Sequence, residues 1–459
     1  MNYRVHYCQV LPDQDDRRRL SQRARIPRLR LPTESLETRL ARERNPFRRF
    51  LARLGPGLIT GASDDDPSGI GTYAQAGAAL GLAPLWTAFF TFPMMYVVQF
   101  ICAKIGMITG SGLARVLRTH YPRSLLFPVV AALVIANTIN AGVDIGAIAA
   151  AVHLVTPIPD RAALVPIAAV ILVVQILGSY RLLAKIFKWL TLALFAYVLS
   201  AFLSRPDWGA VFVATVRPTL RVDRQFLTVI VAILGTTISP YMFFWQADQE
   251  VEEEISMGRR TLKQRRGATA AELRDAEWDV ASGMLFSNVV MYFIILATAS
   301  TLFHGGRSTS IQSATEAAQA LRPLAGGAAS LLWAIGLIGA GMLSVPILTG
   351  SAAYAVAEAL GWRHGLDERP RRAKLFYGII VVSTIVGMMI NFAGINAMTA
   401  LFWTAVINGV LAPPMLVVVM LIANNRAVLG HHVNGRATNA IGWITTAAMF
   451  AAAISMALV

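Results

Sequence analysis

Six stretches without Asp, Glu, Lys or Arg occupy much of the chain beyond residue 50 and limit what it can fold into. These stretches are residues 67–103, 225–247, 280–306, 323–357, 375–425 and 437–459. Each is longer than the roughly 20 apolar residues that a helix needs to cross a bilayer. Soluble domains are about 25% charged, whereas this chain is 15% charged and 55% hydrophobic. The sequence therefore predicts an all-α polytopic membrane protein.

Turn residues divide the apolar segments into eleven expected transmembrane helices. Gly81 and Pro84 separate two helices within 67–103, and Asn391 and Gly394 separate two within 375–425. The expected helices are residues 55–80, 84–109, 124–153, 162–180, 183–204, 225–247, 278–303, 323–360, 375–391, 397–424 and 437–458.

The distribution of basic residues predicts the orientation of these helices. With the N-terminus in the cytoplasm, the cytoplasmic segments hold 34 of the 41 Lys and Arg residues. The other seven are arginines at positions 161, 205, 217, 221, 224, 307 and 322. Because cytoplasmic loops are enriched in Lys and Arg, we expect the N-terminus inside and the C-terminus outside. The same rule predicts that residues 323–360 form one long helix, because two helices there would place the basic loop 363–374 outside.

The N-terminal segment carries much of the formal net charge of +15. Residues 1–53 hold 14 arginines against six acidic residues and contain no apolar run. A basic tail of this kind suits anionic lipid at the cytoplasmic membrane surface better than nucleic acid. We expect residues 1–49 to form a disordered cytoplasmic tail. A second mixed-charge segment, 248–277, is expected to be a solvated loop, with a regulatory cation site as the alternative.

The first expected helix contains an unusual polar interruption. Residues 61–69 read Gly-Ala-Ser-Asp-Asp-Asp-Pro-Ser-Gly. Each carboxylate at the bilayer centre costs roughly 2.5–3.5 kcal/mol on insertion scales, so intramembrane acids usually serve a function. Pro67 disfavours helical geometry at Asp66, so we expect the helix to unwind there. Unwinding frees carbonyl oxygens beside a carboxylate, and hard divalent cations prefer such ligands.

The sixth expected helix is interrupted in the corresponding place. Residues 235–241 read Gly-Thr-Thr-Ile-Ser-Pro-Tyr. Helix 1 is the first of one group of five helices, and helix 6 is the first of a second group of five. Because five is an odd number, the two groups cross the membrane in opposite directions. Paired breaks in inverted halves indicate the central binding site of a transporter. The alternative is that Pro240 only kinks a packing helix.

At these residues the sequence resembles the Nramp family of divalent-metal transporters. Gly55-Pro56-Gly57, the break 66–69 and Gln75-Ala76-Gly77 are similar to the family's first helix, and 235–240 to its sixth. The resemblance covers most of residues 50–459. It implies a LeuT-type inverted repeat of five and five helices with broken helices 1 and 6, plus one extra C-terminal helix. The expected transporter domain comprises repeats 54–204 and 225–425 and helix 437–459.

The family's ligand positions map onto a changed set of residues here. The ligand Asp falls on Asp66, the Asn on Gly69, the alanine carbonyl on Thr236, and the Met thioether on Ser239. The two histidines of helix 6 become Tyr241 and Gln246. The acidic pair of helix 3 becomes Asn140 and Val143, with Asp144 one position away. The loss of a thioether favours hard over soft cations. This pattern resembles the Nramp-related magnesium transporter branch, which implies transport of Mg²⁺ and Mn²⁺ without tight proton coupling.

The expected metal site comprises Asp66, Ser63, Gly69, Thr236 and Ser239. Candidates to line the cavity or support the ligands are Asp64, Asp65, Tyr241, Gln246 and Asn408. Asp66 matches the motif, while Asp64 and Asp65 remain alternative ligands. Asn288 and Asn408 are candidate supporting donors, although ordinary hydrogen bonding between helices explains each of them as well.

The function expected is a secondary carrier of divalent cations, in the bacterial inner membrane, with no cofactor and no obligatory protein partner. The main alternative is a proton-coupled Mn²⁺/Fe²⁺ importer like the main family. A Na⁺-coupled organic-substrate symporter on the same fold is disfavoured because three aspartates repel a substrate carboxylate. Paired broken helices argue against a channel or receptor. No nucleotide-binding loop, HExxH motif or Ser/His/Asp arrangement indicates an enzyme.

Overall fold

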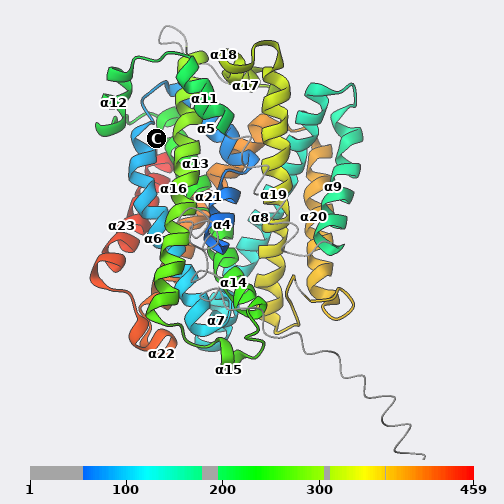
Figure 1. Ribbon diagram of the computed structural model, residues 1–459, viewed down its shortest axis with the longest axis vertical. Helices are drawn as coiled ribbons and strands as arrows, with labels where there is room; N and C mark the ends of the chain where they lie inside the picture. The colour runs from blue at the N-terminus through cyan, green and yellow to red at the C-terminus, as the bar shows by residue number, and fades with distance from the viewer. Residues whose placement is uncertain (1–54, 178–194, 304–310, 367) are drawn as a thin grey trace, which may run out of the picture. The chain divides into compact units, whose positions relative to one another are not determined.

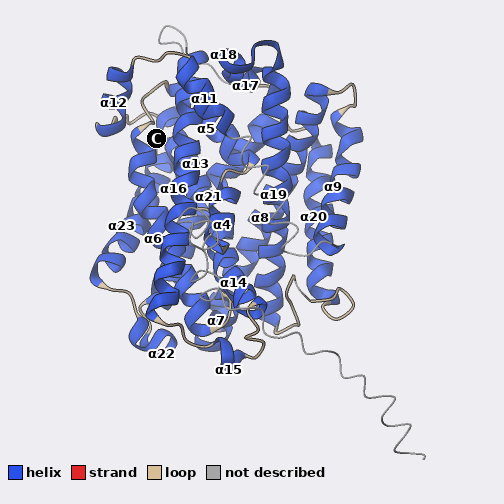
Figure 2. Ribbon diagram, in the orientation of Figure 1, coloured by secondary structure: helices blue, strands red, loops and turns tan. Residues whose placement is uncertain are grey.

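The computed structural model describes residues 55–177, 195–303, 311–366 and 368–459. Every regular element in these residues is a helix (Figure 2). The longer helices are α4 (Pro56–Asp64), α5 (Pro67–Leu80), α6 (Trp86–Thr109), α7 (Leu113–His120), α8 (Arg123–Val155), α9 (Asp160–Leu177), α11 (Phe195–Leu203), α12 (Trp208–Val216), α13 (Arg224–Thr237), α14 (Pro240–Ser256), α16 (Ala270–Thr301), α19 (Ala329–Leu360), α20 (Lys374–Ile390), α21 (Ala397–Ala423) and α23 (Arg436–Leu458). The short ones are α15 (Leu262–Arg265), α17 (Ala314–Ala318), α18 (Arg322–Ala325) and α22 (Arg426–Leu429), with 3₁₀ turns at 319–321, 326–328, 391–393 and 430–432.

Nine helical segments in the described ranges are long and apolar enough to cross a membrane. Two expected crossings fall outside this set. Helix 55–80 is present as the two shorter pieces α4 and α5, and helix 183–204 lies largely outside the described residues. The expected tail 1–49 also lies outside them. The count of eleven crossings therefore stays a prediction.

The predicted divisions between helices are confirmed at several points. α5 ends at Leu80 and α6 begins at Trp86, while α20 ends at Ile390 and α21 begins at Ala397. Gly81 and Gly394 both adopt left-handed φ angles, +63° and +76°, which suit glycine. Of the single helix predicted for 323–360, residues 329–360 form one helix, α19, while the residues before it belong to α18 and a 3₁₀ turn.

The prediction of a solvated loop over 248–277 is wrong for its acidic part. α14 continues to Ser256, and Glu250, Glu252 and Glu254 on it are buried. They accept hydrogen bonds from neighbouring polar side chains, namely Gln246, Tyr354 and Arg259. These partners replace water around the carboxylates, so the helix runs on where the charges suggested a loop. On the far side, α16 begins at Ala270, eight residues before its predicted start.

Close helix contacts hold the two broken helices in place. Both α4 and α5 pack against α16, and α13 packs against α21 (Figure 1). A Cβ atom on Gly61 of α4 would lie 2.2 Å from the backbone of Gly283 of α16. A Cβ on Gly235 of α13 would lie 2.1 Å from the carbonyl oxygen of Ala405 of α21. Glycine is therefore required where each broken helix approaches its neighbour, because any side chain would clash.

A carboxylate from α16 also holds the start of α4. The side chain of Asp279 accepts hydrogen bonds from the backbone N–H groups of Gly55, Gly57 and Leu58, at 2.8, 2.6 and 3.2 Å. These groups have no partner within their own helix. A negative charge at a helix N-terminus is also favoured by the helix dipole. α16 thus fixes α4 at its first turn as well as along its length.

Candidate metal site

The chain unwinds between α4 and α5 at the predicted position. α4 ends at Asp64, and Asp66 is extended (φ −68°, ψ 168°) immediately before Pro67 at the first position of α5. One oxygen of Asp66, Oδ1, accepts hydrogen bonds from the Gly69 N–H at 2.6 Å and the Ser68 hydroxyl at 2.8 Å. Asp66 therefore caps α5, and this fixes its carboxylate at the break.

The second break has a similar backbone conformation but no side-chain cap. α13 ends at Thr237, and Ser239 is extended (φ −77°, ψ 136°) before Pro240, which opens α14. The Ser239 hydroxyl donates to the carbonyl oxygens of Gly235 at 2.7 Å and Thr236 at 2.9 Å. Its proton is thus shared by two carbonyl oxygens at the end of α13.

The two breaks lie against each other. The Tyr241 hydroxyl donates a 2.9 Å hydrogen bond to the carbonyl oxygen of Ser63. A Cβ atom on Gly69 would lie 3.1 Å from Thr236 Oγ1 and 3.4 Å from Asp66 Oδ1. The structure thus gathers Ser63, Asp66 and Gly69 from one break with Thr236 from the other.

The three aspartates point to different neighbours. Asp66 Oδ2 accepts a 3.2 Å hydrogen bond from the side-chain amide of Asn140 on α8. Asp64 and Asp65 instead share the hydroxyl of Ser287 on α16. All three side chains are at most 2% exposed. In the described part of the chain no ion pair joins any of them to a cationic side chain.

A fourth carboxylate, Asp144 of α8, is buried near Asp66. The Ser344 hydroxyl of α19 donates to Asp144 Oδ2 at 2.7 Å, and the charges of Asp144 and Asp66 interact electrostatically. This residue lies one position from the family's acidic pair, and the structure shows that its side chain faces the same region as the Asp66 break. Asn140, at the other family position, contacts Asp66 directly.

Several buried oxygens around the breaks have no hydrogen-bond partner among the described residues. They are Asp64 Oδ1, Asp65 Oδ2, Asn140 Oδ1, Asp144 Oδ1 and Thr236 Oγ1. A buried polar atom without a partner costs about 1–3 kcal/mol, and more when it is charged. Within the described ranges no group of three or more His, Cys, Asp or Glu side chains is arranged to hold a metal by itself. A cation here would therefore need hydroxyl, amide and carbonyl oxygens beside the carboxylates.

Gln246 and Asn408 are the remaining predicted residues. The Gln246 amide donates to Glu250 on the same helix at 2.8 Å, and Asn408 is buried in α21. No hydrogen bond recorded in the described residues links either to Asp66. Asn288 contacts Thr91 and Met95 of α6, which is the ordinary role between helices. Sequence reasoning missed Ser287 and Ser344, because a serine in an apolar helix carries no signal of its own.

Comparison with known proteins places the chain in a family. The sequence profile of the natural resistance-associated macrophage protein-like (Nramp) family matches residues 57–459. A protein of Klebsiella pneumoniae subsp. pneumoniae named divalent metal cation transporter MntH is 28% identical over 400 residues, covering 86% of this chain and 91% of that protein.

Two solved structures show the fold. A mutant of the Eremococcus coleocola manganese transporter superposes with a TM-score of 0.67 at 18% identity, covering 89% of this chain and 86% of that one. The inward-facing conformation of Mhp1 superposes with a TM-score of 0.51 at 14% identity, covering 88% and 90%. The LeuT-like fold implied by the sequence resemblance is confirmed by these neighbours. With the family profile matching from the first turn of α4 to the last residue, the chain belongs to the Nramp family of multi-pass integral membrane proteins.

Proposed function

We propose that this protein carries divalent metal cations, Mg²⁺ and Mn²⁺, across the membrane by alternating access. The observation that carries the proposal is the set of three buried aspartates at a helix break, unpaired with any cationic side chain in the described residues. Buried charges need a partner, and a transported cation would supply one. The names of the relatives, a divalent metal cation transporter and a manganese transporter, support the same substrate class.

The donor set favours hard cations. Asp66 would bind the ion directly, with the Ser63 carbonyl, the Gly69 position, Thr236 and Ser239 around it. These residues offer oxygen atoms, and Mg²⁺ wants near-octahedral oxygen ligands and retains several waters. Ser239, at the family's thioether position, is shorter than Met and leaves room for such waters. On these grounds we propose that the chain belongs with the Nramp-related magnesium transporter branch.

We also propose that transport runs without tight proton coupling. Histidine titrates near neutral pH and suits proton relays, but Tyr241 and Gln246 stand at the two histidine positions. The Tyr241 hydroxyl donates to Ser63, so its role here is to join the breaks. Asp144, buried near Asp66, is the observation that favours the second candidate, a proton-coupled Mn²⁺/Fe²⁺ importer.

Metal binding to the purified full chain tests the proposal. Isothermal titration of Mn²⁺ and Mg²⁺ should show binding by the wild type and none by Asp66→Asn, which keeps the shape of the side chain but not its charge. Asp223→Asn, which alters a carboxylate that caps α13 far from the break in sequence, is the matched control and should bind normally. Equal affinity of Asp66→Asn and the wild type would reject Asp66 as the ligand and move the assignment to Asp64 or Asp65.

The expected orientation follows the positive-inside rule. We propose that the protein lies in the bacterial inner membrane with its N-terminus in the cytoplasm and its C-terminus outside. Under this proposal α4 and α14 lie toward the cytoplasm, and α5 and α13 toward the exterior.

A further inference from the structure

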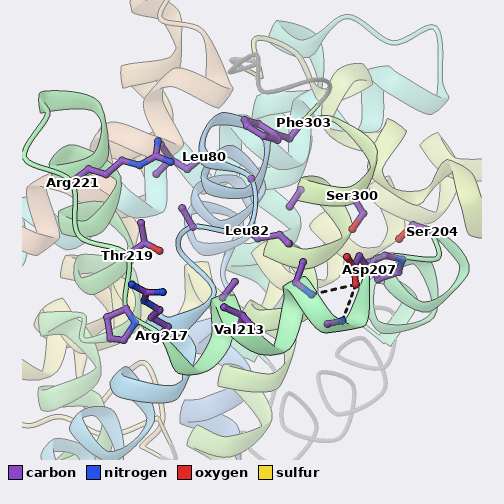
Figure 3. Close-up of a pocket in the computed structure, with 18 of the residues that line it drawn as sticks. Leu80, Leu82, Ser204, Asp207, Val213, Arg217, Thr219, Arg221, Ser300 and Phe303 are labelled. Atoms are coloured by element: carbon purple, nitrogen blue, oxygen red, sulfur yellow. Dashed lines mark hydrogen bonds between the residues drawn. The ribbon is translucent and has the colours of Figure 1, made fainter.

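Four of the seven arginines that the charge rule leaves on the outer side are clustered between residues 205 and 224. The structure places three of them, Arg205, Arg217 and Arg221, around one cavity of about 1140 Å³. The cavity lies between the end of α5, the helix α12 and the end of α16 (Figure 3). Most Lys and Arg residues of this chain fall in its expected cytoplasmic segments, so basic residues on the outer side are unusual. Three of them around one cavity suggest that the cavity binds a ligand.

The cavity carries a surplus of positive charge. Its acidic lining residue is Asp207, and Asp207 Oδ1 accepts hydrogen bonds from the N–H groups of Gly209 and Ala210 at the start of α12. No ion pair in the described ranges neutralises the three arginines. Figure 3 shows Arg217 and Arg221 on one side of the cavity and Asp207 on the other. The basic side is therefore open to an anion.

The rest of the lining is largely apolar. Leu80, Leu82, Val213 and Phe303 line the cavity (Figure 3), and Leu220 also belongs to its lining. A fully hydrated ion gains no binding free energy from such a surface. A hydrocarbon chain does gain binding free energy, because its apolar surface is removed from water. The ligand that fits has an anionic head and an apolar tail.

Outside the cavity lining, α12 also presents an exposed apolar face. α12 exposes large hydrophobic side chains, with Trp208, Phe212 and Val216 at 45%, 69% and 60% exposure. Tryptophan is enriched at membrane interfaces, and an apolar helix beside basic residues is typical of a segment lying in the interface plane. The apolar face of α12 would thus meet acyl chains while the arginines meet headgroups.

We propose that this cavity binds an anionic phospholipid of the outer leaflet. Arg217 and Arg221 hold the phosphodiester through charge-assisted hydrogen bonds, for which the arginine fork is well shaped. The acyl chain lies over Leu220 and the outer face of α12. A bound lipid would pack between the end of α5 and α12, and would anchor the outer half of the broken first helix.

Quenching of Trp208 fluorescence by bromine-labelled lipids tests this site. The full chain is reconstituted in phosphatidylcholine vesicles with either brominated phosphatidylglycerol or brominated phosphatidylcholine at equal mole fraction. The chain has nine tryptophans, so the Trp208 signal is the difference between the wild type and Trp208→Phe. Brominated phosphatidylglycerol should quench this signal at a lower mole fraction than brominated phosphatidylcholine.

Matched variants separate a specific site from general attraction. Each basic side chain near an anionic surface contributes about fivefold in affinity, so Arg217→Gln with Arg221→Gln should reduce the preference about thirtyfold. Arg217→Lys with Arg221→Lys should retain much of it, and Arg322→Gln, an exposed arginine of the same side outside the cavity, should retain it fully. Equal quenching by both lipids, or a preference that survives the double Gln variant, would overturn the proposal. Displacement of the brominated lipid by millimolar glycerol phosphate would also overturn it, in favour of a site for soluble phosphate.

Discussion

The hydroxyl of Tyr241 donates a 2.9 Å hydrogen bond to the carbonyl oxygen of Ser63, and this bond joins the break between α13 and α14 to the break between α4 and α5. Both partners are buried. The backbone carbonyls freed by unwinding are usually satisfied by neighbouring groups when they lie at membrane depth. Tyr241 performs this role for Ser63 and at the same time sets the spacing of the two half-helices.

Tyr241→Phe should therefore destabilise the protein. The variant leaves the Ser63 carbonyl buried without its donor, which costs about 1–3 kcal/mol. Thermal unfolding of the purified chain should show a lower Tm than the wild type. Tyr292→Phe removes a hydroxyl that pairs with Thr215 in a half-buried position, and should lower the Tm less. An unchanged Tm for Tyr241→Phe would show that the bond contributes nothing.

Substitution of Ser239 should alter selectivity. Ser239→Met introduces a soft thioether, so it should raise Cd²⁺ affinity and weaken Mg²⁺ transport. The control is Ser239→Ala, which removes the same hydroxyl and its bonds to Gly235 and Thr236 without adding sulfur. Competition of each metal against Mn²⁺ uptake measures both effects. If Ser239→Ala gains Cd²⁺ affinity as Ser239→Met does, the sulfur is not responsible.

The glycine contact between α4 and α16 should tolerate no side chain. Gly61→Ala places a Cβ 2.2 Å from Gly283, so α4 must shift, at a cost of about 1–3 kcal/mol or more. Gly378→Ala in α20, where a Cβ meets nothing within 4 Å, should be neutral or slightly stabilising, because alanine favours helices. Size-exclusion profiles and Tm values compare the two. Equal behaviour would contradict the packing described for α4.

Metal uptake should not bring protons with it in a fixed ratio. Tyr241 and Gln246 cannot replace histidine as carriers that titrate near neutral pH. Proteoliposomes loaded with a pH-sensitive dye should show no acidification that tracks Mn²⁺ entry. If acidification does track Mn²⁺ entry, the same measurement on the Asp144→Asn variant tests whether Asp144 carries the proton. A loss of acidification in that variant would establish the proton-coupled alternative.

The helix breaks could be predicted because their cause is local. Pro67 and Pro240 each force the preceding residue out of helical geometry, and the structure places Asp66 and Ser239 in extended conformations there. The end of α14 could not be predicted in the same way. The acidic residues 250–254 indicate solvent when considered alone, and one of the donors to them, Tyr354, lies 102 residues away in sequence.

The hydrogen-bond partners of the site residues could not be predicted from the sequence either. Asp66 could be selected from its place in the motif, but Ser287 and Asn140 meet the aspartates only through the packing of α16 and α8. The contact between Asp279 and the start of α4 spans more than 220 residues. The short helices α7 and α12 were missed because eight or nine residues carry too little periodicity to separate them from loop. Contacts across such distances depend on the fold, and no local pattern encodes them.

Competition between Mg²⁺ and Mn²⁺ in proteoliposomes tests the central claim most directly. Uptake of Mn²⁺ by the reconstituted full chain is measured while external Mg²⁺ is raised to millimolar levels, with Asp66→Asn as the blank. The oxygen-lined site proposed here predicts that wild-type chain takes up Mn²⁺ and that Mg²⁺ inhibits this uptake progressively. Mn²⁺ uptake that continues unchanged in millimolar Mg²⁺ would contradict the account.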